Sequence, residues 1–221
     1  MHVALLGGTG DIGEGLALRL GRDTDHEVTV GSRDAEKATA AAEEYERTLA
    51  DHGIEATIEG RENPEAAAAA DVVVLAVPAY YLADTLDAVA DTLGDAVVVS
   101  PAVGMKREEA GMRYNPPGVG SVTQLAAASA PEGTPVAGAF HNLAAGKLAD
   151  LDADLDWDVP VVVSDETARE TVVSLVEHID GLRPLIAGGL DNAAEIEALT
   201  PLLINLAQHN EGLHDLGVTF H

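Results

Sequence analysis

The chain of 221 residues contains no cysteine, which excludes disulfide bonds and thiolate chemistry. It also has no run of about 18 apolar residues, so no transmembrane helix is predicted. Its first residues enter a strand pattern at once, without the charged and apolar stretches of a secretory signal. We therefore expect a soluble, cytoplasmic protein whose mature form begins at Met1.

Basic residues are scarce: 12 lysines and arginines stand against 38 aspartates and glutamates, which gives a formal net charge of −26. The acid excess therefore disfavours nucleic acids and anionic membrane surfaces as partners, because both attract basic surfaces, and we expect neither. Aromatic residues make up only 3% of the chain. This composition is typical of a protein that works in a cytoplasm at molar salt, where a Debye length of about 3 Å screens the repulsion between carboxylates. An ordinary acidic enzyme is the alternative.

No metal site is predicted. The histidines, among them His209 and His214, lack the spacing of metal ligands, so we expect them to be surface or packing residues. The acidic run 150–158 lacks the glycine and the terminal glutamate of a calcium loop. We expect this run to be a solvated loop.

Short apolar runs alternate with longer amphipathic or alanine-rich segments in the first half of the chain. This pattern is typical of βαβ units and a parallel sheet. The run 72–77 is continuously apolar, as expected for a central strand that is covered on both faces. We predict strands at 2–6, 27–31, 55–59, 72–77 and 95–99. We predict helices at 11–21, 34–51 and 81–92, with a short turn near 64–69.

The pattern changes beyond Ser100. Residues 104–120 are rich in glycine, proline, arginine and methionine, and they predict a long excursion over a ligand. We predict strands at 134–139, 159–163 and 182–187, a helix at 165–179, and a helical stretch at 191–209 capped by Asp191 or Asn192.

The predicted fold class is α/β: a Rossmann-type doubly wound parallel sheet with a smaller C-terminal α/β and helical region. We assign residues 1–135 to the Rossmann domain and residues 136–221 to the C-terminal region, with an approximate boundary. One compact unit is the alternative.

The segment Gly8-Thr9-Gly10-Asp11-Ile12-Gly13 matches the G-x-G-x-x-G fingerprint of dinucleotide-binding folds. It follows an apolar strand directly and opens a helical segment, which is the context that the motif requires. The glycines permit a tight turn and a close approach of the backbone to a pyrophosphate at the helix N-terminus. We predict that this contact is lined by Thr9, Gly10, Asp11 and Ile12.

The end of the second predicted strand distinguishes NADP from NAD. NAD-specific folds place an acidic residue there to bind the ribose 2′-hydroxyl, whereas this chain has Gly31-Ser32-Arg33, followed by Lys37. A hydroxyl and two cations suit a 2′-phosphate, since Arg33 can make charge-assisted bonds and Lys37 lies on the same helix face. NADP is therefore predicted, with Ser32 in its site. An ion pair between Lys37 and Glu36 is the structural alternative for that lysine.

Further segments, together with residues 3–10 and Gly31-Ser32-Arg33, carry a family resemblance. They are Trp157-Asp158-Val159-Pro160-Val161, Ile179-Asp180-Gly181-Leu182-Arg183-Pro184-Leu185, Leu199-Thr200-Pro201-Leu202 and Leu216-Gly217. Over nearly the whole chain, the sequence resembles the F420-dependent NADP reductase family. With its acid excess, it looks like a member from a halophilic archaeon.

The resemblance implies reversible hydride transfer between carbon 4 of the NADP nicotinamide and carbon 5 of the deazaflavin coenzyme F420. Both coenzymes would be substrates, and no metal is implied. Such a transfer requires mainly that the reacting carbons lie about 3–3.5 Å apart in a dry cleft. By family position, Val77 and Tyr81 flank the NADP. Val103 and Ala145 border the nicotinamide, and Leu216 contacts the deazaflavin. Packing roles are the alternatives for Tyr81 and Leu216.

His141 follows a predicted strand and is the candidate catalytic residue. It could bind a deazaflavin oxygen or assist protonation of this coenzyme. A structural histidine that is bonded to the backbone is the alternative.

Two other functions remain open at this stage. An NADP-dependent imine or carbonyl reductase would need a proton donor such as His141 or Tyr81. A non-catalytic NADP-sensing module would bind the dinucleotide without turnover.

The last helical stretch carries apolar residues at helical spacing, and these predict packing on the Rossmann domain or on a second subunit. They are Ile196, Leu199, Leu202, Leu203 and Leu206. Together with the resemblance, they lead us to predict a homodimer.

Overall fold

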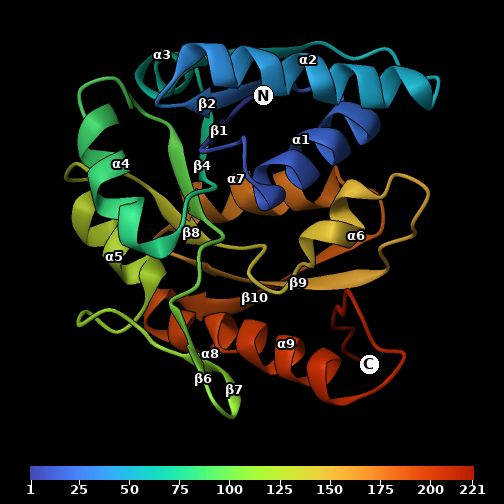
Figure 1. The fold of residues 1–221 in the computed structure, drawn as a ribbon. Helices are drawn as coiled ribbons and strands as arrows, with labels where there is room; N and C mark the ends of the chain where they lie inside the picture. Colours follow the sequence, from blue (N-terminus) through green and yellow to red (C-terminus); the bar gives the residue numbers. More distant parts are fainter.

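The computed structural model describes all 221 residues and is built around one eight-stranded sheet (Figure 1). Its strands are β1 (His2–Leu6), β2 (Glu27–Ser32), β3 (Ile58–Glu62), β4 (Val72–Leu75), β5 (Val97–Ser100), β8 (Val136–Gly138), β9 (Trp157–Val163) and β10 (Leu182–Gly189). The strand order is β10-β9-β8-β5-β4-β1-β2-β3. All neighbours pair parallel except β8 and β9, so β9 and β10 run opposite to the other strands.

Helices cover both faces of this sheet, and a separate hairpin stands beside it. The helices are α1 (Asp11–Asp23), α2 (Ala35–Asp51), α3 (Asn63–Ala68), η1 (Ala79–Tyr81), α4 (Leu82–Val89), α5 (Val122–Ser129), α6 (Ala145–Ala149), α7 (Glu166–Glu177), η2 (Leu190–Asn192), α8 (Ala193–Glu197) and α9 (Leu199–His209). The hairpin pairs β6 (Met105–Glu108) with β7 (Gly111–Tyr114) in antiparallel register.

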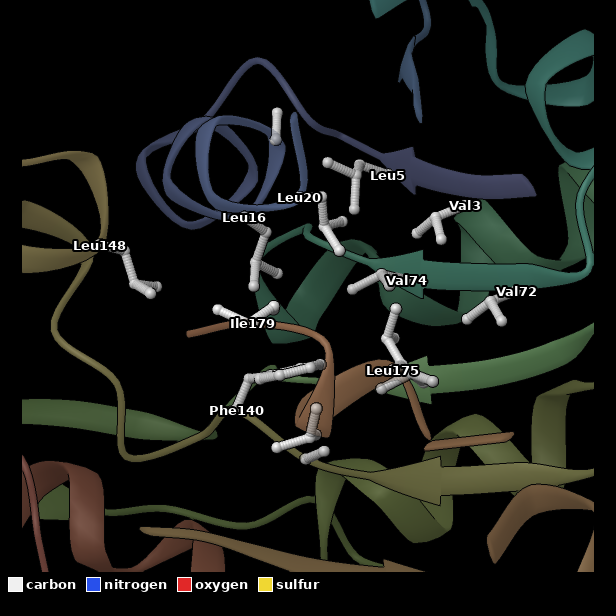
Figure 2. Packing of buried hydrophobic residues seen from close by; sticks show 14 of the residues in the cluster. Val3, Leu5, Leu16, Leu20, Val72, Val74, Phe140, Leu148, Leu175 and Ile179 are labelled. Carbon is white, nitrogen blue, oxygen red and sulfur yellow. The ribbon is translucent and has the colours of Figure 1, made fainter. Parts of the chain in front are cut away.

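Alternation along β1 divides the core into two layers. Val3 and Leu5 pack in the layer that holds residues of α1, α2 and α7, whereas Ala4 and Leu6 pack against α3 and α4 on the opposite face. This division follows from the period of two in a strand, and it fills both faces of a buried parallel sheet with apolar side chains. Figure 2 shows Leu16 of α1 in the first layer.

The C-terminal helix α9 packs beside the hairpin rather than in the main core (Figure 1). The side chain of Asn205 accepts a hydrogen bond from the Met112 N–H (2.8 Å) and donates one to the Met112 carbonyl (2.7 Å). In this way Asn205 completes the hydrogen bonds of β7 as a neighbouring strand would. The hairpin is therefore tied to the last helix.

The predicted fold class is confirmed, and most predicted strands and helices are present. β3 begins at Ile58 instead of residue 55, because it is an edge strand whose charged residues show no apolar alternation. β4 ends at Leu75 instead of residue 77, since the chain leaves the sheet before Pro78, which has no N–H to donate. The expected excursion at 104–120 contains the β6–β7 hairpin.

The helical stretch expected at 191–209 is divided into η2, α8 and α9, and Pro201 lies in the first turn of α9, where proline is tolerated. Asn192 is the N-cap residue of α8, but its side chain makes no capping bond, since its amide donates to the Ala187 carbonyl (2.7 Å). Asp191 does not cap the helix, and its carboxylate accepts from Gln124 (3.4 Å). The short helices α5 and α6 were not predicted, because neither is long enough to show helical periodicity.

The division near residue 135 falls just before β8, and both parts contribute strands to the same sheet. No helix has the length and apolar character that a bilayer crossing requires.

Candidate functional site

The turn between β1 and α1 is built from glycines that permit close approach. Gly7 has a φ of +74°, in the region that favours glycine. A Cβ atom at Gly13 would collide with the backbone of Gly8, so only glycine lets the helix start so close to the strand. At Gly10, by contrast, the nearest atom to an added Cβ is 3.7 Å away, the Gly7 carbonyl. No protein atom therefore occupies the space next to the Gly10 backbone, which leaves this space open to a ligand.

The first turn of α1 is free to meet an anion. Gly10 is its N-cap residue and has no side chain to accept a hydrogen bond from the N–H groups that follow. Those N–H groups and the helix dipole favour a phosphate at this end. The backbone of the turn therefore fits the pyrophosphate of a dinucleotide.

Tyr45 on α2 holds the turn in place, since its hydroxyl donates to the Gly8 carbonyl (3.0 Å). Burial and the nearby carboxylates, of which Glu14 has the largest effect, raise the pKa of Tyr45 to about 12. The hydroxyl therefore stays protonated as a donor. Burial and the charges of Glu44 and Asp11 also raise the pKa of Glu14.

The end of β2 presents two cations that have no carboxylate within 4 Å, namely Arg33 and Lys37. The ion pair of Lys37 with Glu36 is thus not formed. Asp34 directly follows Arg33 in the sequence, but its carboxylate caps α2 by accepting from the N–H groups of Glu36 (3.0 Å) and Lys37 (3.2 Å). The guanidinium of Arg33 instead lies over the ring of Tyr81, 5.1 Å from its centroid.

A cavity of about 1040 Å³ opens at the carboxyl ends of the strands, where open α/β sheets bind ligands. Its lining is mainly apolar. Most of the predicted site residues lie on this one surface: Gly10, Asp11, Ile12, Val77, Val103, His141, Ala145 and Leu216.

The remaining predicted residues lie outside that lining, at the carboxyl ends of β1, β2 and β4 or in the segments that follow these strands. They are Thr9, Ser32, Arg33, Lys37 and Tyr81. The contact of Arg33 with Tyr81 brings two of these turns together.

The wall opposite the glycine-rich turn comes from α9 and the C-terminal tail, and sequence reasoning largely missed it. Its residues are Thr200, Leu203, Ile204, Ala207, Gln208, Leu213, His214 and Asp215. His214 is exposed, as expected for a surface residue, and it also borders the cavity, where its Nδ1 atom lies 3.2 Å from the Asp215 carboxylate. The signal in the sequence was the apolar spacing along α9, which did not show which of its faces borders a cavity.

His141 is buried at one side of the cavity, and burial lowers its pKa to about 3. The ring is therefore neutral at ordinary pH. Its Nε2 atom lies 3.4 Å from the Thr123 hydroxyl, and its Nδ1 atom has no hydrogen-bond partner in the protein. A buried acceptor of this kind favours a donor on a bound ligand.

The α6 segment, which supplies Ala145 to the cavity, is fastened by the buried side chain of Arg19. The Arg19 guanidinium donates to four backbone carbonyls in or just after α6. They belong to Lys147 (2.9 Å), Leu148 (2.8 Å), Asp150 (2.5 Å) and Ala153 (3.0 Å). Burial lowers the pKa of Arg19, but this group remains charged. The cation thus satisfies carbonyls that a helix C-terminus leaves unpaired.

Residues 2–104 match a family model described as "NADP oxidoreductase coenzyme F420-dependent". The chain is also 42% identical to the F420-dependent NADP reductase of Methanothermobacter thermautotrophicus, over 95% of this chain and 90% of that protein. This chain belongs to the F420-dependent NADP reductase family. A second relative of the same name, from Methanocaldococcus jannaschii, is 40% identical over 93% of this chain and 92% of its own.

A solved structure supports the assignment of this chain to the F420-dependent NADP reductase family, and the similarity extends along the whole chain. The crystal structure of a putative F420-dependent NADP reductase from Arthrobacter sp. FB24 superposes with a TM-score of 0.81. It is 25% identical and covers 99% of this chain and 98% of its own. The family predicted from the sequence is therefore confirmed.

Proposed function

We propose that this protein catalyses reversible hydride transfer between NADP(H) and the deazaflavin coenzyme F420. The observation that carries the proposal is the single cavity that joins the N-terminus of α1 to α9. An apolar cavity of this size accommodates two flat rings together, and both named relatives are F420-dependent NADP reductases.

The NADP end of the site lies at the three turns described above. We assign the pyrophosphate to the backbone of Thr9, Gly10, Asp11 and Ile12, where the helix dipole favours an anion. We assign the binding of the 2′-phosphate to Ser32, Arg33 and Lys37. The absence of an ion pair on either cation supports this assignment, because their charges are available to a ligand.

We place the reacting end of the site among the apolar side chains that line the cavity. We assign Val77, Val103 and Ala145 to the nicotinamide and Leu216 to the deazaflavin. The coenzymes supply the hydride chemistry, in which carbon 4 of the nicotinamide exchanges a hydride with carbon 5 of the deazaflavin. The protein holds the rings in contact and excludes water with these apolar side chains, so orientation replaces acid–base groups as the source of rate.

His141 in this scheme accepts a hydrogen bond and does not donate a proton, because burial holds its pKa near 3. This removes His141 as the proton donor that an imine or carbonyl reductase would need beside its substrate, and it leaves Tyr81 as the candidate donor for that alternative. A non-catalytic NADP sensor would bind the same dinucleotide, so only a measurement of turnover distinguishes it from the proposed enzyme.

The test is to mix the protein with NADPH and oxidised F420 in molar KCl. Loss of deazaflavin absorbance and oxidation of NADPH should proceed in equal amounts, and NADH should be a much poorer donor. Tight binding of NADPH without turnover would contradict the proposal and would favour the sensor.

We also propose a homodimer that uses the outer face of α9. Leu202 and Leu206 on this helix are 52% and 41% exposed, whereas Leu203 and Ala207 line the cavity. Exposed leucines one turn apart suit a helix that is covered by a second subunit. Sedimentation velocity of Leu202→Glu should show monomers where the unmodified chain is dimeric. Val119→Glu, at an exposed apolar residue in a loop, is the control.

The environment that we propose is a cytoplasm at molar salt, as in a halophilic archaeon. The support is the formal charge of −26 on 221 residues, which requires strong screening for a compact state.

A further inference from the structure

Glu197 on α8 is fully buried, and its carboxylate accepts four hydrogen bonds. They come from the Tyr114 hydroxyl (2.8 Å), the N–H groups of Val122 (3.0 Å) and Thr123 (2.9 Å), and the Thr123 hydroxyl (2.9 Å). Burial and the bond to Glu197 raise the pKa of Tyr114, so this hydroxyl remains a donor. A buried carboxylate is costly unless it is fully satisfied, and four donors fix this one in place.

The contact between Thr123 and His141 then has only one possible direction. A hydroxyl carries a single proton, and Thr123 gives its proton to Glu197. Towards the His141 Nε2 atom, 3.4 Å away, Thr123 can therefore only accept. The ring proton of the neutral histidine is thereby placed on Nε2, and Nδ1 is left as an acceptor.

The backbone around His141 is held in an uncommon conformation. Phe140, directly before it, has a φ of +66°, which costs a non-glycine residue free energy and persists only where the surroundings enforce it. The Thr200 hydroxyl donates to the His141 carbonyl (2.5 Å), and the Asn142 amide donates to the Asp158 carbonyl (2.8 Å). These contacts fix the segment from two sides.

Gly138 on β8 makes room for the pair. A Cβ atom there would lie 2.7 Å from the Thr123 hydroxyl oxygen and 3.0 Å from Cε1 of His141. Any larger residue would push the two side chains apart. The ring therefore sits where β8, α5 and the segment after β8 all restrict it. His141 borders the cavity, and its buried Nδ1 atom has no hydrogen-bond partner within the protein.

We propose that Glu197 and Thr123 are positioning residues that hold His141 as the Nε2–H tautomer, so that its Nδ1 accepts a hydrogen bond from a coenzyme N–H in the cavity. The donor is an amide-type N–H, which both coenzymes carry: the carboxamide of the nicotinamide and the imide of the deazaflavin. This inference rests on the proposed function. It adds that His141 favours one orientation of the bound coenzyme ring, because a ring bound the other way round would place a carbonyl oxygen, and not an N–H, beside Nδ1.

The first experiment measures the tautomer directly and requires no turnover. ¹⁵N NMR of histidine-labelled protein in molar KCl distinguishes a protonated from an unprotonated ring nitrogen. The unmodified protein should show His141 protonated at Nε2, and Thr123→Val should shift the population towards the Nδ1–H form. Thr123→Ser should restore the original tautomer. A wild-type His141 protonated at Nδ1, or a Thr123→Val spectrum identical to wild type, would overturn the proposal.

A matched control exists on β2, where the buried Thr29 contacts His2 through the same pair of atoms, Oγ1 and Nε2 (2.7 Å). Thr29→Val also replaces a buried hydroxyl beside a histidine, but it should leave the His141 signals unchanged. Glu197→Gln should act like Thr123→Val, since an amide offers fewer acceptor sites to the four donors. If this variant does not fold, the comparison of Thr123→Val with Thr123→Ser still decides the matter.

The second experiment identifies the donor. NADP⁺ alone and F420 alone are titrated while the Nδ1 resonance is followed, and the coenzyme that supplies the N–H should move it. In kinetics, Thr123→Val should raise the Michaelis constant for that coenzyme about 3- to 10-fold, with a much smaller change for the other coenzyme and in kcat. If both coenzymes bind and neither moves Nδ1, the proposal is wrong. Absence of turnover in the wild type would instead count against the proposed function, and the tautomer measurement would still stand.

Discussion

Arg33 and Tyr81 come from different βα turns, and the guanidinium of the first lies above the ring of the second, 5.1 Å from its centroid. The ring fixes the direction of a long, otherwise mobile side chain without neutralising its charge. Cation and aromatic ring thus form a preorganised surface beside the end of β2.

Reversal of the charge at residue 33 should weaken NADPH selectively. Arg33→Glu removes charge-assisted bonds worth about 1.5–3 kcal/mol, so the Michaelis constant for NADPH should rise about 10- to 100-fold with little change in kcat. Steady-state kinetics with NADPH and NADH measure the effect. Arg169→Glu, at an exposed arginine on α7, is the control and should behave like wild type. An unchanged Michaelis constant for NADPH in the Arg33 variant would show that the 2′-phosphate does not bind at Arg33.

The contribution of Tyr81 to NADPH binding should come from the face of its aromatic ring and not from its hydroxyl. Tyr81→Phe should keep the NADPH Michaelis constant within about 2-fold, whereas Tyr81→Ala should raise it about 2- to 5-fold, in line with a cation–π interaction of roughly 0.5–1 kcal/mol at an exposed site. The same kinetic assay applies. Equal effects of both substitutions would indicate that the hydroxyl, and not the ring, is used.

Loss of Arg19 should destabilise the protein strongly. Arg19→Met fits a similar volume but removes the hydrogen bonds that the guanidinium donates to four carbonyls, so the free energy of unfolding should fall by about 3 kcal/mol or more. Urea unfolding at constant KCl measures the loss, with Arg169→Met as the control. Because Arg19 also fastens the α6 segment, coenzyme affinity should fall in the folded variant. A loss below 1 kcal/mol would show that water replaces the guanidinium.

His141 should make stability depend on pH in a defined direction. Its pKa is about 3 in the folded protein against 6.5 ordinarily, so between these values the unfolded chain binds a proton that the folded protein does not. The contribution is fully present above about pH 6.5 and is lost as the pH falls towards 3, at up to about 1.4 kcal/mol per pH unit.

The matching measurement compares wild type with His141→Asn from pH 7 to pH 4 in molar KCl. Groups common to both proteins cancel in the difference of their unfolding free energies. This difference should move in favour of the variant as the pH falls. A constant difference across the range would mean that the imidazole reaches water in the folded state.

Salt should stabilise the fold. With a net charge of −26, the midpoint temperature of unfolding should rise between 0.1 and 2 M KCl, as the Debye length shortens from about 10 Å to a few ångströms. Sucrose at matched osmolality is the control, because it does not screen charge. An equal rise with sucrose would assign the effect to solvent exclusion and not to repulsion between carboxylates.

The sequence was most informative where one local rule determines the structure. The glycine-rich turn, the apolar strand β4 and the cations after β2 each follow from a few adjacent residues, and all were predicted. The antiparallel addition of β9 and β10 was not, since strand direction depends on long-range pairing and leaves no local pattern. The wall from α9 was missed for a related reason: Leu202 and Leu203 are equally apolar, yet one is exposed and the other borders the cavity.

The network of Glu197 lay beyond sequence reasoning as well. A single glutamate at the end of a short helix looks like any surface acid in a chain with 38 acidic residues. Only the fold shows that it is fully buried and 2.9 Å from the Thr123 hydroxyl. The coenzyme contacts of individual side chains, the homodimer and the adaptation to salt remain predictions.

The cavity has one wall from the first turn of α1 and another from α9 and the tail that follows it, so the N-terminal and C-terminal parts of the chain meet around it. A coenzyme that bridges these walls links their local unfolding. We therefore expect the tail to be more exposed to proteases when NADP and F420 are scarce than when they are plentiful. The lifetime of this enzyme in the cell should therefore follow the supply of its own coenzymes.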